Sequence, residues 1–140
     1  MFLQIRNAIM EEAKINPNFI TQNVNLDSYL LKIEEHAMFH SAFTKDSLYG
    51  FIAFYANDLN YYQGFISMVH VAPGYRGKGI AKTLISATCQ TMKALEMKSC
   101  ALEVLCSNQN AINLYKSLGF KINEERSDIL YMIKDLETEV

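Results

Sequence analysis

Glycine and basic residues alternate in the segment "VAPGYRGKGIAKTL" (71–84), where an amphipathic helix begins. Gly77 and Gly79 weaken a helix, but they let a ligand approach the backbone closely because no Cβ intervenes. The first amides of a helix have no partner within the helix, and the helix dipole adds positive charge there. Together with Arg76 and Lys78, these amides predict a site for an anion such as phosphate. A solvated basic loop with a glycine turn is the alternative.

Two common phosphate-binding motifs do not fit this segment. In a P-loop counted from Gly74, the lysine and hydroxyl positions hold Ile80 and Ala81. The dinucleotide fingerprint needs a third glycine or alanine where Lys82 stands, and it follows a strand of a doubly wound parallel sheet. These two mismatches argue against a nucleotide-binding module.

The residue periodicity predicts the helices and strands that position this segment. The expected helices are 2–15, 26–36, 78–97 and a short one within 108–119, and the expected strands are 37–43, 48–56, 61–71, 100–106, 120–125 and 128–136. Asn25 and Asn108 are candidate N-caps, and "NPN" at 16–18 ends the first helix. The strands 61–71 and 100–106, joined by the long helix, should be parallel, and ligands bind at the carboxyl ends of such strands.

The pattern Arg76-x-x-Gly79-x-Ala81 resembles the acetyl-CoA signature of the GCN5-related N-acetyltransferases (GNAT), Gln/Arg-x-x-Gly-x-Gly/Ala. The stretch "LEVLCSNQNAINLYKSLGF" (102–120) is similar to the second signature of that family in both order and spacing. The resemblance covers about 37–134. It implies an α+β fold whose central, mostly antiparallel sheet has one parallel pair splayed at the cofactor cleft and is flanked by helices.

The resemblance implies one N-acetyltransferase domain over residues 1–140. Residues 1–36 form its helical acceptor-side segment, and residues 37–134 form its acetyl-CoA-binding core. The family's usual opening strand has one candidate here, "FIT" at 19–21.

The resemblance also implies how acetyl-CoA is held. The backbone of 69–71 pairs with the pantetheine arm as another strand would, and the amides of 76–81 hold the pyrophosphate. Asn108 contacts the cofactor and also serves as a helix cap. The expected cofactor-binding residues are Val69, His70, Val71, Arg76, Gly77, Lys78, Gly79, Ile80, Ala81, Asn108 and Tyr115.

Two residues are candidates for acid and base in acetyl transfer, which needs a neutral amine and a proton for the leaving thiolate. Tyr115 shares a helix face with Ala111 and Leu118, which directs its ring toward the sheet opening and predicts that it protonates the thiolate. A plain core tyrosine is the alternative. Glu103 in "LEV" resembles the glutamate that serves as base in the branch that acetylates protein N-termini, and a solvated or ion-paired glutamate is the alternative.

Other polar residues of this region are expected to be structural. His70 should pack under the helix, and Asp58 should form a turn. The segment 61–71 contains no carboxylate, which supports an alternative function as a non-catalytic CoA-binding or regulatory domain. The leading hypothesis is an acetyl-CoA-dependent N-acetyltransferase that acts on a primary amine of a small molecule or protein by direct attack.

Composition limits the partners and the compartment. A net charge of −2 does not favour nucleic-acid binding, and no apolar run has the length of a signal peptide or a membrane span. Three cysteines without a CxxC pair predict free thiols in a reducing compartment, so the expected location is cytoplasmic. The expected partners are an amine acceptor and a second copy of the chain in a homodimer, without nucleic acid, membrane or metal.

Overall fold

The computed structural model describes residues 2–15, 25–45 and 47–137. The predicted stop at 16–18 and the candidate strand at 19–21 lie outside these residues. The helices and strands are α1 (Phe2–Ile15), α2 (Leu26–His36), β1 (Met38–Phe43), β2 (Leu48–Tyr55), β3 (Gln63–Val71), α3 (Ile80–Ala94), β4 (Ser99–Leu105), α4 (Gln109–Ser117), β5 (Lys121–Arg126) and β6 (Ile129–Asp135).

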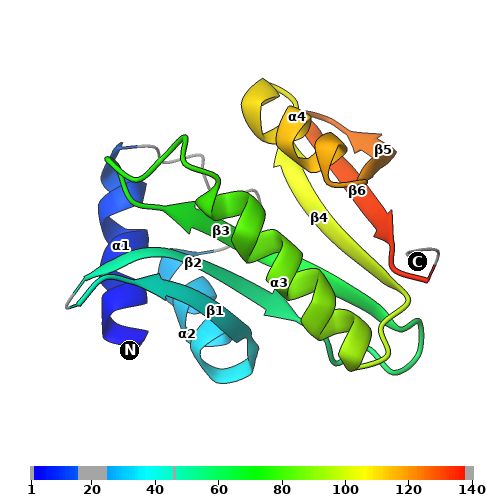
Figure 1. Ribbon diagram of the computed structural model, residues 1–140, viewed down its shortest axis with the longest axis horizontal. Helices are drawn as coiled ribbons and strands as arrows, with labels where there is room; N and C mark the ends of the chain where they lie inside the picture. The colour runs from blue at the N-terminus through cyan, green and yellow to red at the C-terminus, as the bar shows by residue number, and fades with distance from the viewer. Residues whose placement is uncertain (1, 16–24, 46, 138–140) are drawn as a thin grey trace.

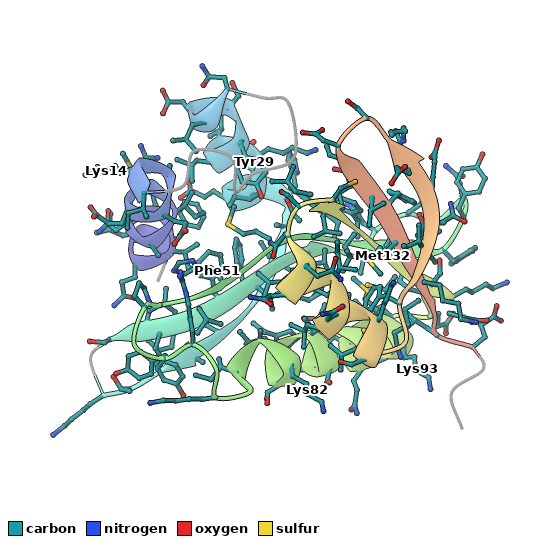
Figure 2. The ribbon with its side chains drawn as sticks, turned by 90° about the horizontal axis from the view of Figure 1, so that it is seen from above. Lys14, Tyr29, Phe51, Lys82, Lys93 and Met132 are labelled. Atoms are coloured by element: carbon teal, nitrogen blue, oxygen red, sulfur yellow. The ribbon has the colours of Figure 1, made fainter. Side chains whose placement is uncertain are left out.

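One six-stranded sheet organises the fold in the order β1-β2-β3-β4-β6-β5. Every pair of neighbouring strands is antiparallel except β3 and β4, which are parallel, as the sequence predicts. Helices α1 and α2 cover one face of the sheet, and α3 covers the other face (Figures 1 and 2). The apolar side chains form one core on each face, and the core under α3 also includes α4.

The helix ends follow the local sequence. Asn25 caps α2, and its Oδ1 accepts the N–H of Asp27 at 2.8 Å. Helix α3 begins only at Ile80, two residues later than predicted, because Gly79 adopts a left-handed φ of +81°. It also ends earlier than predicted, at Ala94, and the next residue, Leu95, is 45% exposed.

The β2–β3 connection is a turn, so β3 starts two residues later than predicted. Oδ1 of Asp58 accepts the backbone N–H groups of Asn60 and Tyr61 at 3.0 and 3.1 Å, which confirms the predicted role of Asp58 in a turn. Tyr62 has a φ of +54°, which no strand residue adopts.

A β-bulge in β3 changes which way its side chains point. Ala53 of β2 pairs with Met68 and the next residue, Phe54, pairs with Ile66, so Ser67 is an extra residue in β3. Ile66 belongs to the core under α3, whereas Met68 belongs to the core under α1 and α2. The bulge therefore turns every later side chain of β3 to the face opposite the one that strict alternation predicts.

The two parallel strands pair over a short stretch only. Residues 63–66 of β3 pair with residues 99–102 of β4, and beyond this point the strands diverge toward their carboxyl ends (Figure 1). The divergence opens the sheet beside the loop that leads into α3.

Candidate functional site

A cleft of about 260 Å³ lies where β3 and β4 diverge. Residues 66–71 form one wall and residues 102–105 form the other. Glu12 of α1, Arg76 of the glycine segment, Asn108 and Tyr115 complete its lining. The cleft thus unites both segments that carry the sequence resemblance.

At 69–71, the wall formed by β3 has no paired strand on its cleft side, and the Val71 carbonyl there accepts a hydrogen bond from Arg76. His70 and Val71 pair with Phe51 and Gly50 of β2 on one side, and on the other side β4 has already diverged. An extended ligand can add to such an edge through main-chain hydrogen bonds. This is the arrangement expected for the backbone of 69–71.

The glycine segment forms a second hollow, of about 290 Å³, at the start of α3. Gly77, Gly79, Ile80 and Ala81 line it. Gly77 and Gly79 have φ values of +78° and +81°, and a Cβ built on either has no heavy atom within 4 Å. Gly79 is the N-cap residue of α3, and glycine has no side chain that could accept a hydrogen bond from the first amides of the helix.

Arg76 and Lys78 of the segment already make contacts within the chain. Nε of Arg76 donates to the carbonyl oxygen of Val71 at 2.7 Å, and Nη2 lies 2.9 Å from Oε1 of Glu12. Nζ of Lys78 lies over the ring of Tyr75, 5.7 Å from its centroid. Arg76 therefore fixes the loop to the end of β3 and to α1, in addition to contributing charge.

The Tyr115 side chain reaches the cleft from α4, as its helix position predicts. Its ring packs edge-on against Phe120, with 5.9 Å between the centroids. Burial raises the pKa of the Tyr115 hydroxyl to about 12. The hydroxyl therefore stays protonated at neutral pH and is a permanent hydrogen-bond donor.

Glu103 and Asn108 lie on the other side of the cleft. Leu102 and Val104 are buried in the core under α3, so Glu103 between them points to the opposite face, as strand alternation predicts. It is the register partner of Tyr131, whose pKa is raised by burial and then by the Glu103 charge. Asn108 caps α4 through Ala111, whose N–H donates to Oδ1 at 3.2 Å, and it also lines the cleft.

His70 is buried, as predicted, but the helix over it is α1. Its Nδ1 lies 3.8 Å from Oε1 of Glu12, and its ring centroid lies 5.5 Å from that of Phe51. Burial lowers the pKa of His70; the Glu12 carboxylate opposes this shift and Arg76 adds to it. The cause of this placement is the bulge at Ser67, which strand alternation alone does not predict.

Sequence reasoning did not single out Glu12 as a site residue. Ile5, Ile9 and Glu12 follow each other at helical spacing, so the carboxylate ends the apolar stripe of α1. A carboxylate on a core-facing stripe is the sequence signal for it. Its partners, Arg76 and His70, lie about 60 residues away in the chain, and no local pattern connects them.

Within 2–15, 25–45 and 47–137, no group of three or more His, Cys, Asp or Glu side chains is placed to hold a metal ion. In the same part of the chain, no helix has the length and apolarity to cross a membrane.

The family model described as the acetyltransferase (GNAT) family matches residues 3–120, most of the chain. The protein therefore belongs to the GNAT family. This fits the splayed parallel pair and the glycine-led helix, and it confirms the fold that the sequence predicts.

Curated relatives match over a shorter stretch. The chain is 38% identical over 58 residues to N-alpha-acetyltransferase 30 of Saccharomyces cerevisiae, covering 41% of this chain and 33% of the relative. It is 35% identical over 63 residues to the glucosamine 6-phosphate N-acetyltransferase of Trypanosoma brucei brucei, covering 45% of this chain and 41% of the relative. The chain thus spans between a third and two fifths of the length of these relatives.

Among solved structures, the PaiA N-acetyltransferase of Thermoplasma acidophilum in complex with coenzyme A has the same fold. The TM-score is 0.74 at 20% identity, over 96% of this chain and 92% of that chain.

Proposed function

We propose that the protein is an N-acetyltransferase that transfers the acetyl group of acetyl-CoA to a primary amine. The observation that carries this proposal is the cleft between β3 and β4, which is lined by the end of β3 and by Tyr115 and shares Val71 and Arg76 with the hollow at the glycine-led start of α3. Membership of the GNAT family and the names of the relatives support it.

The residues fit acetyl-CoA along its length. The free edge at 69–71 suits the amides of the pantetheine arm. The amides at the start of α3 suit the pyrophosphate, since the open space at Gly77 and Gly79 admits a close approach. Acetyl-CoA supplies a thioester whose carbonyl carbon an amine can attack.

Each side of the cleft has a separate chemical task. The Tyr115 hydroxyl donates to the sulfur as the thiolate leaves. Its pKa of about 12 exceeds the ordinary thiol pKa of about 8.5, so hydrogen bonding contributes more than complete proton transfer. Glu103 lines the cleft, holds the acceptor ammonium with its charge and is the candidate base that the family resemblance implies.

The first acceptors to test follow from the relatives. N-alpha-acetyltransferases, by name, acetylate α-amines. Glu103 in "LEV" resembles the glutamate of the branch that acetylates protein N-termini. We therefore propose the α-amine of a peptide as the first acceptor class and an amino sugar phosphate as the second. A cytoplasmic location and a homodimer remain predictions, and the three free cysteines support the former.

The deciding experiment measures release of the CoA thiol from acetyl-CoA against a panel of amines. The panel contains peptides with free N-termini, the same peptides blocked by acetylation, and glucosamine 6-phosphate. Transfer to a free peptide but not to its blocked form supports the proposal. Calorimetric binding of acetyl-CoA without transfer to any amine would instead establish a non-catalytic CoA-binding domain.

A further inference from the structure

A histidine that the acetyltransferase proposal leaves without a task lies in the same cleft. His70 lines the cleft from β3, on the wall opposite Glu103 of β4. The bulge at Ser67 is the reason, because it directs the His70 side chain toward α1 and away from the core under α3.

The surroundings of His70 define its tautomer. The carboxylate of Glu12 is 3.8 Å from Nδ1, so it favours the tautomer with the proton on Nδ1. This leaves the lone pair on Nε2 as the hydrogen-bond acceptor of the ring. Glu12 is 13% exposed and is itself held by Arg76 at 2.9 Å, so its position is fixed.

The charges around His70 come from two elements. Glu12 on α1 and Arg76 after β3 face it, and Phe51 of β2 packs against its ring without charge. Burial and Arg76 favour the neutral imidazole, whereas Glu12 stabilises the imidazolium once it forms. A neutral imidazole next to a carboxylate is suited to accept a proton near neutral pH.

We propose that His70, oriented by Glu12, accepts the proton that the acceptor ammonium loses before it attacks acetyl-CoA. The inference rests on the proposed acetyl transfer. It gives His70 the proton and leaves Glu103 the task of holding the ammonium.

The protons balance in this scheme. One N–H bond of the ammonium breaks and its proton moves to Nε2 of His70, directly or through a water. The amine lone pair then forms the C–N bond, and the C–S bond of the thioester breaks. The nitrogen sheds a second proton, which ends on the CoA sulfur with the help of Tyr115. His70 finally releases its proton to solvent.

The test combines kinetics with a direct titration. The pH dependence of kcat/KM is measured for the protein, for His70→Gln and for Glu12→Gln, with a peptide acceptor. The pKa of His70 is measured separately by NMR of the imidazole Cε1–H signal, assigned through its proximity to the ring protons of Phe51. His36→Gln is the matched control, because His36 also lies beside a carboxylate, Glu35 at 3.6 Å, but is exposed and outside the cleft.

The proposal predicts that kcat/KM falls at low pH, and that the apparent pKa of this acidic limb equals the pKa of His70 measured by NMR. The limb should vanish in His70→Gln, with a loss of about 10²–10⁴-fold at neutral pH. In Glu12→Gln, which removes the charge that raises the pKa of His70, the limb and the NMR pKa should move together to lower pH. His36→Gln should match the parent protein, and Glu103→Gln should keep the limb while its rate falls.

Several results overturn the proposal. A folded His70→Gln that binds acetyl-CoA and keeps the parent rate and limb excludes the imidazole as the proton acceptor. If His70→Gln does not fold, Glu12→Gln decides. An NMR pKa of His70 that moves in Glu12→Gln, while the acidic limb of kcat/KM stays fixed, also excludes the imidazole as the proton acceptor. If the parent protein binds acetyl-CoA but acetylates no amine, the proposed function fails as well, so the two failures are distinguishable.

Discussion

Tyr115 shows how one side chain combines a structural and a chemical task. Its ring packs against Phe120, and the residue also lines the cleft. Since burial raises its pKa to about 12, the hydroxyl remains a donor over the whole range in which an amine becomes nucleophilic.

Replacement of this residue by phenylalanine separates the two tasks. Tyr115→Phe keeps the ring contact and removes the donor, so kcat should fall by about 10²–10⁴-fold. The melting temperature and the acetyl-CoA affinity should stay close to those of the parent. Stopped-flow and calorimetric measurements on the same preparation check this. An unchanged kcat would show that the hydroxyl has no catalytic task, and an unfolded variant would show that it is structural.

Local rules account for the positions of three candidate site residues, whose roles stay predictions. Helix spacing places Tyr115, strand alternation places Glu103, and the N-cap rule places Asn108. The environment of His70 depends instead on a single extra residue, Ser67, and the ion pair of Glu12 with Arg76 depends on how α1 packs. Both are tertiary effects, and no local pattern contains them.

At the scale of the element, the start of α3 is the proposed anion site. A substitution at Gly79 tests it, because Asn and Asp have nearly the same shape and both tolerate a left-handed φ better than most residues. The two variants then differ in one negative charge at the helix N-terminus.

We expect Gly79→Asp to bind acetyl-CoA about tenfold more weakly than Gly79→Asn, because its carboxylate repels the pyrophosphate. The Asp carboxylate interacts favourably with the positive end of the helix dipole at this position. The unfolding free energy of Gly79→Asp should therefore not be lower than that of Gly79→Asn. Calorimetry at two salt concentrations measures both affinities, and the difference should shrink at high salt. Equal acetyl-CoA affinities of the two variants at low salt would show that the pyrophosphate does not bind at this helix start.

The contact of α3 with the sheet depends on a second glycine. A Cβ at Gly64 of β3 would overlap the Met92 side chain of α3, which is completely buried. Gly64→Ala should therefore lower the free energy of unfolding by about 1–3 kcal/mol. Met92→Leu shortens the overlapping side chain, so in urea titrations the double variant should lose less than the sum of the single losses. Strict additivity would show that α3 shifts as a unit instead.

At the scale of the whole molecule, the cleft connects segments from both ends of the chain. Helix α1, the end of β3 and the glycine segment meet at Glu12, His70 and Arg76. The succession of helices and strands along the chain and the parallel pair followed from the periodicity and the family resemblance, because they rest on repeated local signals. The way α1 attaches to the cleft had no such signal.

The same cluster makes the stability of the molecule depend on pH. The pKa of His70 lies below 6.5 in the folded protein, whereas an unfolded histidine has a pKa of about 6.5. Between these two values the unfolded chain binds more protons than the folded one, so the free energy of unfolding falls as the pH is lowered. The contribution of neutral His70 is fully present above pH 6.5 and is lost as the pH falls through the folded pKa.

His70→Gln isolates this contribution from that of the carboxylates. We expect the free energy of unfolding of the parent, minus that of His70→Gln, to be constant from pH 7 to 8. It should then decrease toward pH 5, with a slope of at most about 1.4 kcal/mol per pH unit, the limit for one proton. Guanidinium titrations at half-unit pH intervals measure the difference. A difference that is independent of pH would mean that folding leaves the pKa of His70 unchanged, and a difference that increases toward pH 5 would mean that pairing with Glu12 raises it.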